Sequence, residues 1–237
     1  MGYIFGITNG RYISLMAVHK TEDTRRADGV INDAERRLLD SALNLFGRNG
    51  YDGTSIREII GDAGVTRPVL YYYFKNKEDV FCRLVEAQFE DVCEAIDEIL
   101  GADMDFRTKL RALGRESFAR AERSPAMVRL LLQFFFSSSD KGIRLDKDRL
   151  AGARFGRIVA AMQQGIDAGI LCGGDAPTLA MVFTGILDMR VMARVGGDDR
   201  PLTPAVSDEL VELFLVGAAS GQAGSRAGAA DTGQTRK

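Results

Sequence analysis

The stretch GVTRPVLYYYFKNKE, residues 64–78, decides the fold of this chain. Its first glycine ends a short turn, and Thr66 then offers a side-chain oxygen that suits the N-cap of a helix. Pro68 falls near the first turn of that helix, where its missing N–H costs little. The sequence therefore predicts a short helix from Thr66 to about Phe74, followed by a break and a new N-cap at Asn76.

This short helix has two different sides. Leu70 and Phe74 are spaced i, i+4, and we expect them to face a small core. Arg67 and Tyr71 have the same spacing on another side of the helix. Their guanidinium and phenol groups suit a flat, polar and anionic binding partner. A DNA major groove admits one helix of this size, and arginine fits the acceptors on the edge of guanine. The alternative is that this side is only a solvated helix face.

Two further helices are predicted upstream. Asn32 is a good N-cap for the first, which has apolar residues at steps of three and four and ends near Gly50. Thr54 or Ser55 caps the second, with Glu58 near the position that a capping box expects. Three short helices with a tight glycine turn between the second and third form a helix-turn-helix.

Downstream, Asn76 caps a long fourth helix that continues towards Leu100. Every strong pattern after it is again helical, and none shows the alternation of a strand, so we expect an all-α protein. The remaining helices are predicted near residues 106–122, 125–136, 146–171, 176–195 and 204–219. From Gly217 the chain is rich in glycine, alanine, serine and glutamine, which is typical of a disordered tail.

Composition excludes several classes of function. The chain has 237 residues, with 31 basic and 33 acidic residues, and its one histidine is His19. A single histidine rules out a multi-histidine metal site, and we expect no metal, no cofactor and no catalytic residue. Three cysteines and the lack of a secretory signal indicate the cytoplasm. No apolar run approaches the roughly 18 residues that span a bilayer.

The stretch from Arg37 to Phe81, about a fifth of the chain, resembles the DNA-binding domain of the TetR (tetracycline repressor) family of bacterial regulators. The residues that carry the resemblance are the glycine turn, the hydroxyl cap, the aromatic run and the sequence Phe-Lys-Asn-Lys-Glu. The family often has histidine where this chain has Tyr73, and alanine where it has Ile60, which leaves the fine docking geometry open. The resemblance implies an all-α homodimer with an effector-binding C-terminal domain.

The expected DNA contacts combine the family motif with the local chemistry. Ser55 opens the second helix with Thr54, and free amides at a helix N-terminus attract phosphate. The resemblance places the family's contacts on Thr54, Thr66, Arg67, Pro68, Tyr71, Tyr73 and Lys77. The chain would then divide into a disordered extension (1–31), a helix-turn-helix domain (32–78), an effector-binding and dimerisation domain (79–216) and a disordered tail (217–237).

The C-terminal helices carry aromatic and methionine residues that suit an apolar effector pocket. The candidate pocket residues are Phe106, Phe118, Met127, Leu131, Phe134, Phe135, Phe155 and Met162. The alternative is that these residues are simply core. The last two helices are apolar enough to form a dimer interface, the alternative being that their apolar residues pack internally. Its candidate residues are Leu179, Val182, Phe183, Ile186, Leu210 and Phe214.

We therefore expect a cytoplasmic, dimeric transcriptional regulator, a repressor that binds a palindromic operator and is released by an apolar small-molecule effector. Its partners would be double-stranded DNA, a second copy and that effector, with no membrane. One alternative is a helical protein that binds a ligand or a partner and has a degenerate DNA-binding head. Another is an all-α enzyme, which the lack of a metal cluster and of a glycine-rich phosphate loop makes less suitable.

Overall fold

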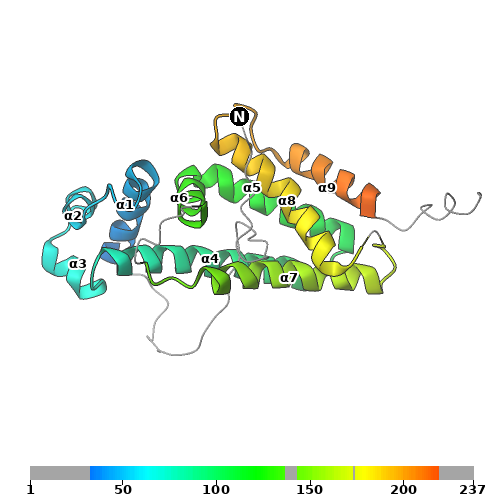
Figure 1. Cartoon of the computed structure of the whole chain (residues 1–237), viewed down its shortest axis with the longest axis horizontal. Coiled ribbons are helices and arrows are strands. Elements are labelled where there is room, and N and C mark those ends of the chain that lie inside the picture. Colours follow the sequence, from blue (N-terminus) through cyan, green and yellow to red (C-terminus); the bar gives the residue numbers. More distant parts are fainter. Residues whose placement is uncertain (1–32, 137–142, 173, 219–237) are drawn as a thin grey trace, which may run out of the picture.

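The computed structural model describes residues 33–136, 143–172 and 174–218. All the regular elements in these ranges are α-helices, so the all-α prediction is confirmed (Figure 1). The helices are α1 (Asp33–Asn49), α2 (Ile56–Ala63), α3 (Arg67–Tyr73), α4 (Lys77–Gly101), α5 (Phe106–Arg123), α6 (Pro125–Phe136), α7 (Lys147–Asp167), α8 (Ala176–Val195) and α9 (Pro204–Ala218). The expected N-terminal extension and the tail beyond residue 218 lie outside the described residues.

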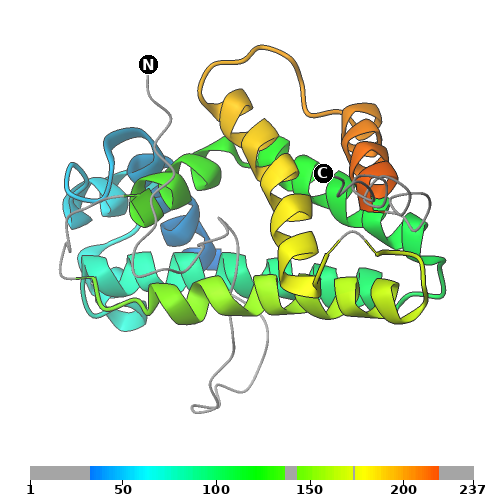
Figure 2. The same cartoon turned by 45° about the vertical axis from the view of Figure 1, so that its right-hand side comes forward.

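The helices form a small head and a longer body. Helices α1, α2 and α3 gather at one end, while α4 and α7 lie side by side along one side of the molecule (Figures 1 and 2). Helices α5, α8 and α9 pack together on the other side of the body, and α6 lies against α1. The outermost helices, α2 and α3, are therefore held at the far end of the long α4.

Local sequence signals explain where the head helices begin and end. Ser55 caps α2 and forms the expected capping box with Glu58. Gly64 follows α2 with a φ of 61°, a left-handed conformation that favours glycine. Asn76 caps α4 through its side chain, which accepts a hydrogen bond from the Asp79 amide.

One predicted boundary was wrong. Helix α7 ends at Asp167, four residues before the predicted end at Leu171. Gly169 adopts a φ of 69°, and the amides of Ile170 and Leu171 both donate to the Gly165 carbonyl. This turn is the left-handed type that commonly ends a helix, and the apolar pattern continues through it because Leu171 is still buried.

The apolar residues form two buried clusters. The first joins α1, α2 and α3 to the first half of α4, to α6 and to the beginning of α7. The second fills the space between the end of α4 and helices α5, α7, α8 and α9. Helix α6 therefore shares a core with the head, although it lies far from the head in the sequence.

Helices α1 and α6 approach each other closely at Gly47. A Cβ atom built on Gly47 would lie only 3.0 Å from both the Cβ and the carbonyl oxygen of Ala126. The contact is made by backbone and a single methyl group, so no long side chain can move to make room. The head is thus fixed to the second residue of α6 at this point.

Replacing Gly47 with valine should destabilise the protein by about 1–3 kcal/mol, because the added methyl groups overpack a contact that cannot relax. Thermal or urea unfolding of the purified variant measures this change. Gly152→Val on α7 is the matched control, because nothing lies within 4 Å of a Cβ at that position. Equal stability of the two variants would show that the α1–α6 contact is not tight.

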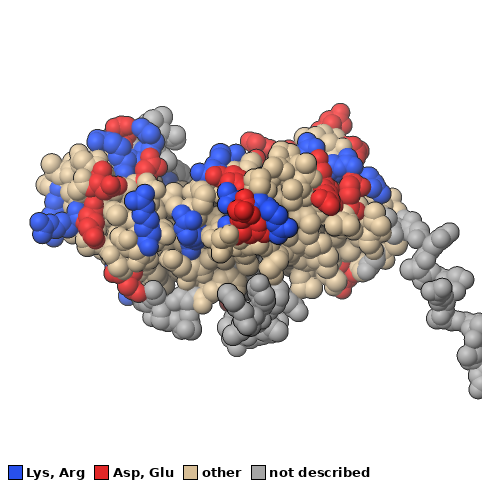
Figure 3. Space-filling model, turned by 90° about the horizontal axis from the view of Figure 1, so that it is seen from above, with Lys and Arg blue, Asp and Glu red and all other residues tan. Residues whose placement is uncertain are grey.

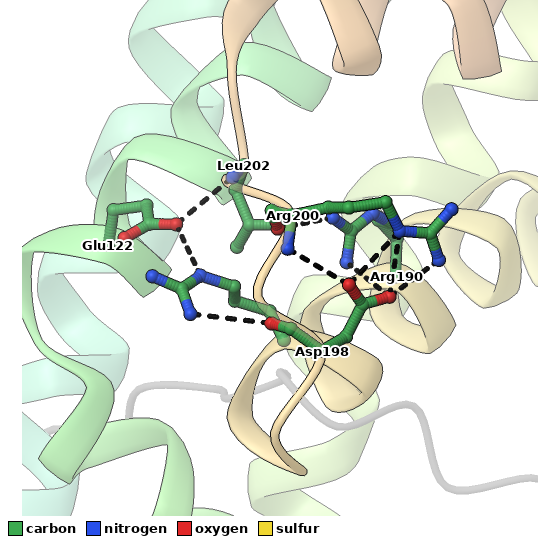
Figure 4. Close-up of polar contacts among 6 residues, drawn as sticks. Glu122, Arg190, Asp198, Arg200 and Leu202 are labelled. Atoms are coloured by element: carbon green, nitrogen blue, oxygen red, sulfur yellow. Dashed lines mark hydrogen bonds and ion pairs between the residues drawn. The ribbon is translucent and has the colours of Figure 1, made fainter.

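Polar contacts tie the loop between α8 and α9 to the end of α5 (Figure 4). The Glu122 carboxylate accepts hydrogen bonds from Arg194 Nε and from the Leu202 amide, both at 3.0 Å. These hydrogen bonds hold the pKa of Glu122 below its ordinary value. Within the loop, Asp198 pairs with Arg200 and Arg190. The α8–α9 hairpin is thus anchored to the helix that leads into α6.

Helix α8 is unusually apolar. Asp188 and Arg190 interrupt its apolar run, yet its length and composition alone would suffice to cross a membrane, with a mean hydropathy of 1.3 over its most apolar window. The structure gives another reason for this composition. One side of α8 is buried in the second core cluster through Leu179, Phe183 and Leu187, while the opposite side carries the exposed Val182 and Met189.

Candidate nucleic-acid interface and ligand site

Helix α3 presents the two sides that its sequence predicts. Leu70 and Phe74 are buried in the first core cluster. Arg67 and Tyr71 are exposed, and the guanidinium carbon of Arg67 lies 5.5 Å from the centre of the Tyr71 ring. Stacking of this kind orients the guanidinium without using its hydrogen-bond donors on protein acceptors. Figure 3 shows lysine and arginine side chains at the end of the molecule where α2 and α3 lie.

The residues beside Arg67 are also open to a ligand. Thr66 occupies the N-cap position of α3, but its side chain makes no capping hydrogen bond, and it is exposed. Pro68 is exposed as well. Tyr73 is half-buried, with its ring edge-on to Tyr72 at 4.9 Å between centres. Thr66, Arg67, Pro68 and Tyr71 therefore form one accessible surface, and Tyr73 lies at its edge.

The N-terminus of α2 is less available to a phosphate than expected. The Ser55 amide donates to a carboxylate oxygen of Glu58 at 2.7 Å, and the Glu58 amide donates to Ser55 Oγ at 3.2 Å. The hydrogen bonds from Ser55 hold the pKa of Glu58 below its ordinary value, so the carboxylate is charged at neutral pH. Two of the amides expected to meet phosphate are thus used within the helix.

Thr54 does not offer its side chain to DNA in this structure. It is buried, and its hydroxyl donates to the Gly50 carbonyl at 2.9 Å. Thr54 instead closes the turn between α1 and α2. The sequence could not separate the two roles, because a threonine next to a helix start suits both a phosphate contact and a turn.

Lys77 also has a different environment from the one expected. Its Nζ donates to the carbonyl oxygens of Tyr51 and Thr54 at 2.8 and 2.9 Å, and it lies 4.3 Å from the centre of the Tyr51 ring. The ammonium therefore ties the start of α4 to the turn between α1 and α2. These contacts position the head rather than leave a free charge for phosphate.

The Lys77→Met variant tests this positioning role. We expect a loss of about 1–3 kcal/mol of stability, because charged hydrogen bonds to two carbonyls are removed. The salt dependence of DNA binding should keep its slope, since a phosphate contact would contribute about one unit to that slope. A flatter slope with unchanged stability would instead restore Lys77 as a phosphate contact.

Arg57 is a candidate that the sequence reading overlooked. It follows the capping residue of α2 by two positions and is exposed. Its place in the first turn of a helix of the helix-turn-helix motif was a signal that could have found it. Lys75, just after α3, is exposed too, so the first turn of α2 and the residue after Phe74 each carry an exposed cation suited to the DNA backbone.

The expected pocket residues are divided between the two core clusters. Met127, Leu131, Phe134 and Phe135 belong to the first core cluster. The other four, Phe106, Phe118, Phe155 and Met162, belong to or pack against the second. Within the described part of the chain, two hollows lie along the groove between α4 and α5, and of the eight residues only Met127 and Leu131 line these two.

The near hollow lies beside the head and is enclosed by α4, α5 and α6. Its lining residues are Gln88, Phe89, Val92, Arg120, Ala121, Ser124, Met127, Val128 and Leu131. The far hollow lies further along the same groove and is enclosed by α4, α5, α7 and α8. Its lining residues are Val92, Ala95, Ile96, Ile99, Leu113, Glu116, Ser117, Arg120, Arg154, Ile158, Phe183 and Leu187.

The far hollow has polar groups that the sequence reading missed. Arg154 and Asp188 form a buried ion pair, with 3.4 Å between Arg154 Nη2 and Asp188 Oδ1. Arg154 and Ser117 both line the hollow. Buried charge is costly, and one explanation for retaining it is a functional role. The available signal for Arg154 was its position, four residues after the buried Leu150 and four before the buried Ile158 of α7.

The candidate dimer residues divide into two groups. Leu179, Phe183 and Phe214 are buried within the subunit, and the rings of Phe183 and Phe214 meet at 5.3 Å between centres. The sequence alone could not separate these three from an interface, because α8 and α9 are apolar on both sides. Ile186 and Leu210 are half-buried. The exposed apolar residues of the two helices are Val182, Met189, Leu213 and Val216.

Comparison with known proteins identifies relatives of this chain. The family described as "Bacterial regulatory proteins, tetR family" matches residues 38–84. The fatty acid metabolism regulator protein of Bacillus subtilis is 24% identical over 183 residues, or 76% of this chain and 93% of that protein. The transcriptional repressor KstR2 of Rhodococcus jostii is 31% identical over 104 residues, which cover 43% of this chain and 51% of that protein.

Solved structures show the same fold. The transcriptional regulator FadR from Bacillus subtilis, in complex with stearoyl-CoA, matches this chain with a TM-score of 0.67 and 22% identity. The match covers 77% of this chain and 98% of that structure. It extends well beyond the helix-turn-helix, so the arrangement of the body helices is also shared.

Proposed function

We propose that this chain, whose residues 38–84 match the TetR family of bacterial regulatory proteins, is a cytoplasmic, dimeric repressor that an acyl-chain effector releases from its operator. The observation that best supports the proposed binding to DNA is the exposed Arg67–Tyr71 pair on α3. That pair is backed by a buried core on the other side of the same helix. A rigid helix with an outward arginine suits direct reading of a major groove.

We divide the protein into a head that reads DNA, residues 32–78, and a body that binds the effector and dimerises, residues 79–216. Thr66, Arg67, Pro68 and Tyr71 would make the DNA contacts from α3, with Tyr73 at the edge. Arg57, in the first turn of α2, would meet the DNA backbone, and Ser55 beside it would do so only through donors that its capping box leaves open.

Dimerisation would use the exposed apolar side of α8 and α9. Leu213 and Val216 on α9 are 63% and 78% exposed, and Val182 and Met189 on α8 are exposed too. Two adjacent helices with such faces are typical of a surface that a second copy covers. A dimer would hold two α3 helices at a fixed spacing, as a palindromic operator requires.

The effector class follows from the relatives and from the two hollows. One relative is a fatty acid metabolism regulator, and one structural neighbour was solved with stearoyl-CoA. In this chain the hollows are mostly apolar and lie between α4 and the helices that hold the head. We therefore assign the effector to long-chain acyl compounds. Such a ligand shifts the protein away from DNA only if it binds the released state more tightly.

The test is a titration of the purified protein against the DNA just upstream of its own gene, at several salt concentrations. Tight binding that weakens steeply with salt, and is reversed by palmitoyl-CoA, is the expected result. Absence of binding to that and to other genomic fragments at low salt would favour the alternative of a helical partner-binding protein.

A further inference from the structure

Arg120 lies where the near and far hollows meet. We propose that it acts as a latch between them and that the effector is an acyl chain long enough to pass through both. This inference rests on the proposed function and adds to it a binding path, a polar recognition point and a length requirement.

The two hollows follow each other along the same groove. They share Val92 of α4 and Arg120 of α5, and each has a cavity volume of about 30 Å³ in the present conformation. That volume has room for water but not for an acyl chain, so a ligand can enter only when the side chains between the hollows move apart. Joined at Val92 and Arg120, they would form a single elongated apolar site.

Three contacts hold Arg120 in its present position. Its Nη1 pairs with the Asp91 carboxylate, and its Nη2 donates to the Asp91 carbonyl at 3.2 Å. Its Nε lies 2.7 Å from a carboxylate oxygen of Glu116. Asp91 is on α4 and Glu116 is on α5, so the side chain bridges the two helices across the groove. Only 15% of it is exposed.

The latch can open without stranding a buried charge. The Asp91 side chain is 66% exposed, so water can solvate it when Arg120 leaves. Glu116 keeps a second partner, because Arg123 Nη2 lies 3.1 Å from the same oxygen. Displacing the arginine is therefore a moderate cost that burial of a hydrocarbon chain can offset.

The far hollow contains a recognition point for the polar end of the chain. Ser117 Oγ is buried there and has no hydrogen-bond partner among the described residues. An unpartnered buried hydroxyl is costly and is satisfied when a ligand oxygen accepts a hydrogen bond from it. Arg154 lines the same hollow. A carbonyl or carboxylate oxygen of an acyl group fits this combination of a neutral donor and a cation.

The opposite end of the chain would reach the residues that hold the head. Met127 and Leu131 of α6 line the near hollow, and Ala126 of α6 contacts Gly47 of α1. A chain that fills only the far hollow leaves α6 where it is, whereas a longer chain pushes against it. Release from DNA should therefore depend on chain length more steeply than binding does.

The experiment measures two quantities, ligand binding by calorimetry and release from a fluorescent operator. The ligands are octanoate, palmitate, octanoyl-CoA and palmitoyl-CoA. With the wild type we expect release by a C16 ligand at a concentration at least tenfold lower than by its C8 counterpart. The free acid and the thioester distinguish the two sources of the acyl group, and either one supports the site.

Two variants act on the path in opposite ways. Arg120→Met removes the guanidinium that bridges α4 and α5 but keeps an aliphatic side chain of similar length. It should lower the concentration of C16 ligand needed to release the protein from DNA about fivefold or more. Ala121→Leu fills the near hollow from α5, and it should abolish release by C16 while C8 binding persists. Arg123→Met is the matched control, since Arg123 also contacts Glu116 but lines neither hollow. It should behave as the wild type.

The Ser117→Ala variant tests the polar end separately, and we expect a severalfold loss of affinity for both chain lengths. The proposal is overturned if C8 and C16 release DNA equally, if Arg120→Met and Arg123→Met behave alike, or if no acyl ligand binds a protein that does bind its operator. Should Arg120→Met not fold, Ala121→Leu still decides the path. Failure of the wild type to bind DNA would instead contradict the proposed function itself.

Discussion

Replacing Leu213 with aspartate is expected to separate the dimer into folded monomers and to weaken operator binding a hundredfold or more. Leu213 is 63% exposed in the subunit, so the monomer tolerates a charge there. In a dimer the same charge would be buried without a partner, which is strongly unfavourable. Loss of the second head removes the gain of two to four orders of magnitude that linked binding sites provide.

Sedimentation or light scattering of this variant gives the oligomeric state, and an operator titration gives the affinity. Met104→Asp is the matched control. Met104 is also an exposed apolar residue of similar size, but it lies in the turn between α4 and α5. It should stay dimeric. A dimeric Leu213→Asp protein with normal operator affinity would place the interface away from α9.

The second large effect concerns the DNA-reading side of α3. Arg67→Ala should cost roughly 1–3 kcal/mol of operator binding in each subunit, the value of a good arginine–guanine pair, and a dimer loses this contact twice. Tyr71→Ala should act in the same direction, partly by removing the ring that orients the guanidinium. Both side chains are exposed, so the stability of the protein should hardly change.

Operator titrations with the correct and with scrambled sequences measure this effect. The loss should be confined to the correct sequence, since a base contact specifies and a phosphate contact does not. Arg107→Ala, an exposed arginine on α5 in the body, is the control for net charge. Equal losses on both sequences would mean that Arg67 binds the backbone only.

The ends of the head helices could be predicted closely because capping residues near each end determine them. Ser55 with Glu58, Gly64 and Asn76 each fix a boundary through a hydrogen bond or a backbone conformation that involves near neighbours only. The end of α7 was harder, because Gly169 makes the turn while Leu171 continues the apolar pattern. The spacing of apolar residues indicates which side chains are buried, but it does not show whether the backbone between them is still helical.

The candidate sites were harder still, because they depend on which buried residues leave space between them. Phe134 and Met162 have the composition of pocket residues, yet they pack into the two cores. Arg120 and Ser117 look like ordinary polar residues of α5 in the sequence, and only the packing of α4 against α5 puts them beside the hollows. Similarly, nothing in the family motif shows that Lys77 donates to the carbonyls of Tyr51 and Thr54.

The contact between Gly47 and Ala126 has a consequence for engineering. Backbone and one methyl group meet there, so the joint has no side-chain rotamers that could adapt to a different partner. A chimeric regulator that joins this body to the head of a relative would need a glycine at the position of Gly47, or the matching first turn of α6 from the same relative. If only the segment up to the α3–α4 boundary were exchanged, the α1 of the relative would not fit the α6 of this chain. The practical unit of recombination is therefore the helix-turn-helix together with α6, two segments that are widely separated in the gene.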